Sequence, residues 1–278
     1  MLQQTRVGAV LDHYRRWFER FPTVNALARA REQSVLAAWS GLGYYRRARN
    51  LYAAAKVVAL EREGKFPETT DGLRELPGIG RYTAAAIASI AFGDRAAVVD
   101  SNVERVLQRL TGNADLSDGE TWELAQALIA PERPGDFNQA MMELGATVCL
   151  PRDPKCLICP VMDFCVARGA AKRERRKPRK AVPVAYVLAA KNGSVFLTQR
   201  ARDASLMAGM WELPPCPERS GEDPAARFRH AILDTNYHVT IYTTGSLDEN
   251  GHWIGTSRLP RLALTGLTRK VLRHFRLL

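Results

Sequence analysis

Four of the five cysteines fall within one short segment, CLPRDPKCLICPVMDFC, which begins at Cys149. The other three are Cys156, Cys159 and Cys165, so the spacing is C-x₆-C-x₂-C-x₅-C. In a reducing compartment, thiols this close together indicate a metal site rather than disulfides. The spacing differs from the paired C-x₂-C knuckles of structural zinc and suits an iron–sulfur cluster, and spacing alone leaves zinc as the alternative. Cys216, far downstream, is expected to take no part.

The length and composition of the chain predict a globular protein of two domains. Its 278 residues are 46% apolar, which is enough for a sizeable core. The first residues lack the basic-then-apolar layout of a signal peptide, and no stretch approaches the ~18 uninterrupted apolar residues of a membrane span. We therefore expect a cytoplasmic protein, located with the chromosomal DNA if it acts there, and no membrane partner.

Positive charge is concentrated in one segment. The net charge is +11, which favours a polyanionic partner such as nucleic acid. The segment from Arg168 to Lys180, RGAAKRERRKPRK, contains eight Lys or Arg and one Glu, so it alone contributes +7. Such a run is typical of a solvated linker, and DNA binding has to be argued from other residues.

A change of pattern divides the chain near residues 170–182. Residues 1–169 predict an all-α domain, in which Ala-rich segments of helical periodicity alternate with short breaks such as SGLGYY and GKFPETT. Residues 170–182 form the predicted basic linker. The segments AVPVAYVLAA, SVFLTQR and YHVTIYTTG that follow are short and rich in β-branched and aromatic residues, so residues 183–278 predict an α+β domain.

The segment LPGIGRYTAAAIASIAFG places Gly78 and Gly80 directly before a long apolar helix. A helix N-terminus presents unpaired N–H groups, and glycine lets a phosphate approach the backbone closely. Because a helix and not a strand precedes the turn, residues 70–93 predict a phosphate-binding helix–hairpin–helix, with an ordinary turn as the alternative. Asp100 opens the next amphipathic helix, where it is expected as the N-cap and is also placed to face a DNA strand.

The hairpin, Asp100 and the cysteine loop 149–165 together resemble the endonuclease III superfamily of DNA glycosylases over essentially the whole first domain. In that superfamily the cysteine loop holds a [4Fe–4S] cluster, which the resemblance implies for these four cysteines. Members that also cut the DNA strand carry a Lys just after the hairpin, where this chain has Tyr82. A Schiff base needs an amine nucleophile, so we expect a monofunctional glycosylase that uses water.

Three further segments, MLQQT, GLGYYRRARNL and FNQAMMELGA, are similar to the adenine DNA glycosylase (MutY) family, which removes adenine mispaired with 8-oxoguanine. The resemblance implies a monomer that binds double-stranded DNA containing A:8-oxoguanine or A:G mispairs. It implies that Asp100 stabilises positive charge on the sugar as the bond breaks, and that Tyr82 lines the same pocket.

The resemblance also implies which residues meet the mispair, where the adenine must leave the base stack. Gln3, Gln4 and Thr5 would fill the space of the flipped adenine and touch the oxidised guanine. Tyr44 would wedge into the base stack beside the lesion. Without the family context, a helix-surface position is favoured for the glutamines, and a core position is favoured for the tyrosine.

Residues 207–216, MAGMWELPPC, are similar to the Gly-x-Trp segment of the Nudix-like C-terminal domain in this family. A Nudix hydrolase needs a Glu-rich helix to hold Mg²⁺, and PERSGEDPAARFRHAIL contains no such run. We therefore expect this domain to recognise 8-oxoguanine without hydrolysis. The Phe-Ser-His loop of the family is absent from RHAILDTNYHV, where Thr235 or Asn236 is the expected source of its hydrogen bond.

The opening MLQQTRVGAVLDHY has apolar residues at helical spacing and no N-cap before them, so a helix is expected to be under way at the first residue. In the family another helix precedes this stretch, and its catalytic Glu, the acid that protonates adenine, sits two residues before the Met. We expect Met1 to be an internal methionine of a longer protein, and a protein without its acid is the alternative.

Two other functions compete with adenine removal. One is a catalytically inactive iron–sulfur DNA-binding protein of the same fold. The other is a glycosylase/lyase of the thymine-glycol type, which Tyr82 and the additional C-terminal domain disfavour.

Overall fold

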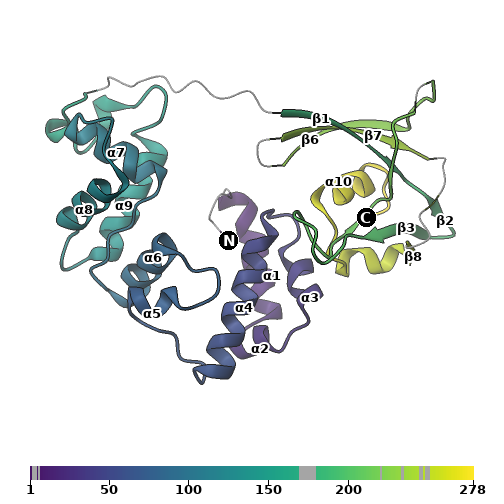
Figure 1. Ribbon diagram of the computed structural model, residues 1–278, viewed down its shortest axis with the longest axis horizontal. Helices are drawn as coiled ribbons and strands as arrows, with labels where there is room; N and C mark the ends of the chain where they lie inside the picture. The colour runs from purple at the N-terminus through teal and green to yellow at the C-terminus, as the bar shows by residue number, and fades with distance from the viewer. Residues whose placement is uncertain are drawn as a thin grey trace. The chain divides into compact units, whose positions relative to one another are not determined.

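The computed structural model describes residues 1, 5, 7–168, 180–219, 221–232, 235–243, 247 and 251–278 (Figure 1). Contacts within the chain form two compact units: Met1–Ala59 together with Lys177–Leu278, and Leu60–Arg176. The predicted division at residues 170–182 follows the order of the chain, whereas these units group the first helices with the C-terminal region. The domain boundaries drawn from the sequence stay a prediction.

The N-terminal helices of the first unit pack around aromatic and aliphatic side chains. Trp17 and Trp39 meet edge to face with ring centroids 5.6 Å apart. Val35 and Leu36 beside them are fully buried. The elements are α1 (Val7–Arg20), α2 (Val24–Ala28), α3 (Glu32–Trp39) and α4 (Tyr45–Glu61).

The first helix begins at Val7, so the expectation of a helix from the first residue was wrong. Met1 and Thr5 are not helical. A tertiary contact explains the difference, because Arg47 of α4 donates hydrogen bonds to the carbonyl oxygen of Met1 (3.5 Å) and to Thr5 Oγ1 (3.3 Å). Apolar spacing alone could not reveal this contact.

The C-terminal part of the first unit contains two small sheets and a closing helix. One sheet has the order β5-β1-β7-β6, and in the other β3 pairs with β2, β4 and β8. The strands predicted from AVPVAYVLAA, SVFLTQR and YHVTIYTTG are confirmed as β1, β3 and β7. The elements are β1 (Lys180–Val187), β2 (Ala190–Lys191), β3 (Ser194–Gln199), β4 (Trp211–Glu212), β5 (Pro215–Cys216), β6 (Ala226–Ile232), β7 (Thr235–Tyr242), β8 (His252–Gly255), η3 (Thr256–Arg261) and α10 (Gly266–His274).

A single apolar core joins both small sheets to α10. Leu197 of β3, Ile241 of β7 and Leu272 of α10 are fully buried in it. β1 runs parallel to β7 from the pair Lys180 and Thr235 onward. The strand therefore starts inside the segment 170–182.

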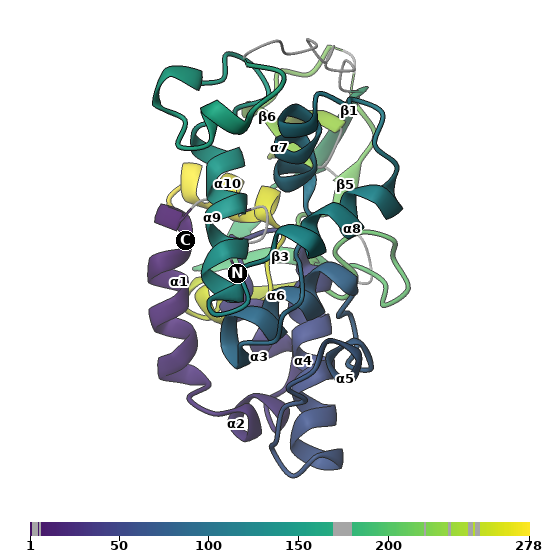
Figure 2. The same cartoon turned by 90° about the vertical axis from the view of Figure 1, so that its left-hand side faces the viewer.

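The second unit is a helical bundle in which most helix ends follow local sequence signals. Ser117 and Glu120 form a capping box at the start of α8, and Gly93 and Gly112 end their helices in the left-handed conformation. The elements are α5 (Thr70–Arg74), α6 (Arg81–Phe92), α7 (Ser101–Thr111), α8 (Asp118–Leu128), α9 (Pro134–Thr147) and the 3₁₀ turns η1 (Cys156–Ile158) and η2 (Met162–Phe164) (Figure 2).

Helices α7 and α9 approach so closely that residue 145 has to be a glycine. A Cβ atom built there would lie 2.6 Å from Asn102 Cβ and 2.9 Å from the carbonyl oxygen of the same residue. No strand occurs among residues 7–168, which confirms the all-α prediction for that range. Within the described ranges, no helix combines the length and apolar character needed to cross a bilayer.

Candidate functional site

The predicted hairpin joins α5 to α6 and ends with Gly80, an exposed glycine directly before α6. Gly78 has the left-handed φ of +75°, and the N–H of Ile79 bonds to Leu76 O at 3.2 Å. Gly80 is the N-cap of α6, so no side chain caps the first turn. Both glycines are exposed, and a Cβ at Gly80 would meet nothing within 4 Å. The helix–hairpin–helix is confirmed, and phosphate binding at its N–H groups stays a prediction.

Asp100 caps α7 through one carboxylate oxygen. Its Oδ1 accepts hydrogen bonds from the backbone N–H groups of Asn102 (2.9 Å) and Val103 (2.8 Å), and Oδ2 accepts from Asn102 Nδ2 at 3.3 Å. The predicted N-cap is therefore confirmed. The negative charge is fixed beside the positive end of the α7 dipole, where it is favourable.

Tyr82 lies in the first turn of α6 and is brought near Asp100. Its Oη donates to Met142 Sδ of α9 at 3.2 Å. Burial, followed by the negative charge of Asp100, raises the pKa of the Tyr82 phenol above its ordinary range. The two side chains proposed from the sequence for one pocket therefore interact electrostatically, and the phenol is neutral at physiological pH.

Arg105, which no sequence motif singled out, connects the helix of Asp100 to the cysteine loop. Its Nη2 donates to Asn102 Oδ1 (2.8 Å) and to the carbonyl oxygen of Gly145 (2.7 Å). Its Nε donates to the carbonyl oxygen of Cys149 at 2.9 Å. Asn102, which donates to Asp100 Oδ2, thus accepts a hydrogen bond from the same Arg105 side chain that bonds to Cys149.

Arg109, one helical turn after Arg105, makes a second connection to the loop. Its Nη1 donates to Leu150 O (2.7 Å) and to Cys149 Sγ (3.2 Å), and its own carbonyl oxygen accepts from Cys165 Sγ at 3.3 Å. Two arginines four residues apart share a helix face. This spacing was the available sequence signal, although it did not reveal what the face contacts.

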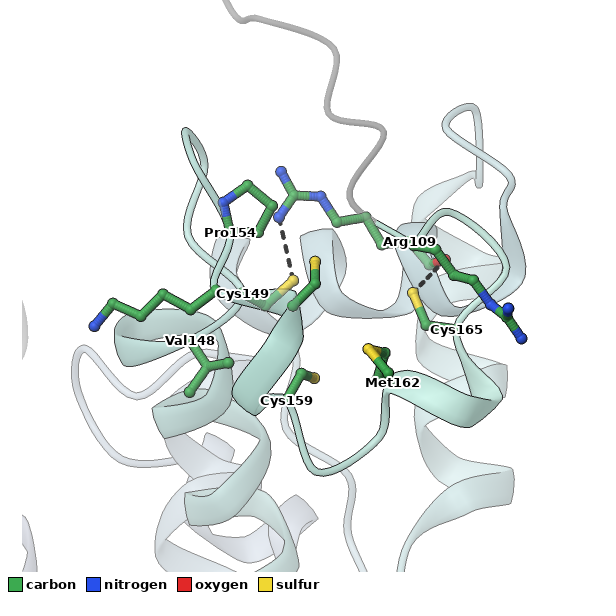
Figure 3. A pocket seen from close by; sticks show the side chains of 10 residues that line it. Arg109, Val148, Cys149, Pro154, Cys159, Met162 and Cys165 are labelled. Atoms are coloured by element: carbon green, nitrogen blue, oxygen red, sulfur yellow. Dashed lines mark hydrogen bonds between the residues drawn. The ribbon is translucent and has the colours of Figure 1, made fainter.

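The four clustered cysteines line one hollow (Figure 3). All four are free thiols. Among the described residues, no group of three or more His, Cys, Asp or Glu side chains is placed to hold one metal ion. Sulfur donors around a hollow with arginine at its rim suit an anionic polynuclear cluster. The hollow is lined by Arg109, Val148, Cys149, Pro154, Lys155, Cys156, Cys159, Met162, Cys165 and Arg168.

The predicted wedge, Tyr44, lies in the turn between α3 and α4 of the first unit. Its backbone is left-handed, with φ of +48°, and 44% of the residue is exposed. The guanidinium of Arg47 lies 5.3 Å from the Tyr44 ring centroid, and the same group bonds to Thr5. The structure thus brings Thr5 and Tyr44 to one arginine. Gln3 and Gln4 lie outside the described residues.

The Gly-x-Trp segment forms β4 and the loop before it. Both carboxylate oxygens of Glu212 accept from Arg200 Nη1 at 2.8 Å, and burial raises the Glu212 pKa despite this partner. Thr235 and Asn236 are half-buried at the start of β7. Their role in reading 8-oxoguanine stays a prediction.

Comparison with known proteins identifies the family. Residues 1–131 match the model of the HhH-GPD superfamily base excision DNA repair proteins. A thermostable thymine-DNA glycosylase of known structure is 31% identical, with a TM-score of 0.57 over 61% of this chain and 81% of that chain. The chain belongs to the HhH-GPD superfamily. A trapped covalent intermediate of endonuclease III with DNA is 29% identical, with a TM-score of 0.54 over 60% of this chain and 79% of that chain.

Two curated relatives of this HhH-GPD chain, from mouse and human, are named adenine DNA glycosylase. The mouse relative is 35% identical over 331 residues, which cover 100% of this chain and 61% of the relative. The human relative is 49% identical over 181 residues, which cover 63% of this chain and 33% of the relative. The chain therefore spans less than two thirds of the length of either protein.

Residues 149–165 match the iron–sulfur binding domain of endonuclease III. This match fits the sulfur-lined hollow, so the predicted [4Fe–4S] cofactor is confirmed and zinc is set aside. Cys149, Cys156, Cys159 and Cys165 line this hollow and are the residues that would hold the cluster, which stays a prediction. Cys216 lies in β5 of the other unit.

Proposed function

We propose that this chain is a monofunctional adenine DNA glycosylase, which removes adenine opposite 8-oxoguanine or guanine by hydrolysing the N-glycosidic bond. The Asp100 carboxylate, held at the start of α7 beside Tyr82, is the observation that carries the proposal. The name shared by the mouse and human relatives supports adenine as the base.

The role proposed for Asp100 is electrostatic. As the bond to adenine breaks, positive charge develops on the deoxyribose, and a preorganised carboxylate stabilises that charge without having to move. Two backbone hydrogen bonds to Oδ1 restrain the carboxylate in this position. Tyr82 stays neutral, so it lines the pocket without adding a second negative charge.

Water is the proposed nucleophile, because residue 82 is not an amine. A lyase forms a Schiff base between a lysine and the sugar, and a neutral phenol cannot do so. Adenine leaves well only when it is protonated, which requires a general acid. The resemblance assigns that acid to a Glu two residues before Met1, and this assignment stays a prediction.

Double-stranded DNA is the proposed partner, and two features support it. The N-terminus of α6, beside the exposed Gly78 and Gly80, suits a backbone phosphate. The basic segment 168–180 supplies charges that release counterions on binding, so it adds affinity without sequence preference. Gln3, Gln4, Thr5 and Tyr44 are proposed at the mispair, in a monomer acting on chromosomal DNA.

Single-turnover release of adenine tests the proposal. Duplexes with A:8-oxoguanine, A:G or A:T are incubated with the 278-residue chain and with a version that places a Glu two residues before Met1. Adenine release followed by strand cleavage only after alkali supports a monofunctional glycosylase. Cleavage without alkali would indicate a lyase, and binding without release by both versions would support the inactive DNA-binding protein.

A further inference from the structure

The turn that carries Tyr44 follows a backbone path that needs support from outside. Gly41, Gly43 and Tyr44 all have positive φ values, +108°, +71° and +48°. A bulky aromatic residue adopts this conformation only where its surroundings impose it. The flanking residues, Ser40 and Tyr45, are 7% and 5% exposed and anchor the two ends of the turn.

Two contacts from the helical region hold the backbone of this turn. Trp39 Nε1 donates to the carbonyl oxygen of Gly43 at 3.0 Å, and His13 Nε2 lies 3.1 Å from the carbonyl oxygen of Ser40.

The C-terminal region provides further contacts, to the side chains at the two ends of the turn. Ser40 Oγ donates to the carbonyl oxygen of Leu264 at 3.1 Å and accepts from Arg269 Nε, also at 3.1 Å. Tyr45 Oη donates to the same Leu264 oxygen at 3.4 Å. One hydroxyl group therefore satisfies a donor and an acceptor that lie more than 200 residues away in the sequence.

The partners of Ser40 are themselves fixed by the first turn of α10. Thr265, the N-cap of this helix, accepts from the N–H of Thr268 at 3.3 Å. Its own N–H donates to the carbonyl oxygen of Trp211 at 2.9 Å. Leu264 directly precedes this cap, and Arg269 follows it by one helical turn. Both contacts to the turn that carries Tyr44 therefore come from the hydrogen-bonded start of α10.

We propose that Arg269, acting through Ser40, is a positioning residue for Tyr44. The C-terminal domain then contributes to mispair recognition by holding the wedge of the helical domain in its inserting conformation, in addition to any contact of its own with 8-oxoguanine. The inference rests on the proposed function for the role of Tyr44 as the wedge. The support of the turn itself does not depend on that function.

Hydrogen–deuterium exchange of the DNA-free chain tests the support of the turn. Amides of residues 41–45 should exchange about tenfold faster in Arg269→Met and in Ser40→Ala, a change of the size typical for coupled positions. Arg269→Lys should restore much of the protection, because its ammonium group can still donate to the hydroxyl. Lys270→Met is the matched control, since this neighbour on α10 donates instead to the carbonyl oxygen of Arg229 at 2.9 Å.

Insertion of the wedge is measured with 2-aminopurine placed beside 8-oxoguanine in an A:8-oxoguanine duplex. Tyr44→Ala defines the fluorescence without a wedge. Arg269→Met should lose most of the fluorescence change and bind the mispair about tenfold more weakly, with unchanged affinity for an A:T duplex. The double variant should lose no more than Ser40→Ala alone, because Ser40→Ala already removes the hydrogen bond from Arg269 together with the one to Leu264.

The outcomes separate the inference from the proposed function. A wild-type chain without preference for A:8-oxoguanine would refute the proposed function, and exchange would still show whether Arg269 supports the turn. Equal exchange rates of residues 41–45 in Arg269→Met and Lys270→Met would overturn the inference. Faster exchange in Arg269→Met together with a wild-type change of 2-aminopurine fluorescence would also overturn it. If Arg269→Met fails to fold, Ser40→Ala and Arg269→Lys decide by the same criteria.

Discussion

Replacing Asp100 by Asn and by Ala should separate its structural role from its proposed chemical role. Oδ1 alone accepts both backbone hydrogen bonds of the cap, at 2.9 and 2.8 Å. The amide oxygen of Asn can accept the same two bonds, whereas Ala accepts neither. Asn therefore removes the charge and keeps the cap, and Ala removes both.

The expected effects on stability follow from this difference. Asp100→Asn should lower the free energy of unfolding by only about 0.3–1 kcal/mol, the value of a carboxylate at a helix N-terminus. Asp100→Ala should lower it by about 1–2 kcal/mol, because the cap itself is lost. Thermal unfolding followed by circular dichroism should place the melting temperature of the Ala variant below that of the Asn variant.

The effect on transition-state binding should be the same for both variants. Opposite unit charges about 4 Å apart interact by roughly 4 kcal/mol at an effective dielectric constant of about 20. We therefore expect affinity for a cationic pyrrolidine nucleotide opposite 8-oxoguanine to fall roughly 10²- to 10³-fold for either variant. Titration of labelled duplex measures this affinity without requiring turnover.

Two results would refute this reasoning. An Asp100→Asn variant that binds the cationic duplex as tightly as the wild type would show that the carboxylate does not face the sugar. An Asn variant as unstable as Asp100→Ala would show that its amide does not replace the cap. An uncharged abasic-site analogue in the same duplex serves as the control, because both variants should bind it with nearly wild-type affinity.

Three further predictions concern packing, a half-buried ion pair and the cofactor. Gly145→Ala should destabilise the chain by roughly 1–3 kcal/mol, because the added Cβ meets the backbone of α7. Gly119→Ala has open space around the added Cβ and should stabilise the chain by up to about 1 kcal/mol. Chemical denaturation measures the free energy of unfolding of both variants. Burial raises the Glu212 pKa, so ionisation of this carboxyl costs stability as pH rises through that pKa. Glu212→Gln should therefore change the free energy of unfolding at pH 7 by less than about 1 kcal/mol, and the stability of this variant should depend less on pH above the ordinary Glu pKa. Arg200→Met should lower the free energy of unfolding by about 2 kcal/mol. A larger loss for Glu212→Gln than for Arg200→Met would contradict this expectation. Metal analysis should find iron and sulfide without stoichiometric zinc, and Cys216→Ser should leave the brown colour of the protein unchanged.

Local interactions explain which features could be predicted from the sequence. The Asp100 cap, the turn at Gly78 and Gly80, and the strands β1, β3 and β7 each depend on residues within a few positions of one another. The iron–sulfur loop was predictable because its four cysteines lie within 17 consecutive residues. The expected helix at Met1 was wrong because a distant side chain, Arg47, holds this part of the chain.

Contacts between distant parts of the chain were decided by the tertiary structure. The sequence shows that Arg105 and Arg109 share a face of α7, and only the fold shows that this face meets the cysteine loop, about 40 residues further on. Ser40 and Arg269 are 229 residues apart, and no periodicity relates them. A hydrogen bond between such side chains forms only after the elements that carry them have packed, so its geometry leaves no pattern in the local sequence.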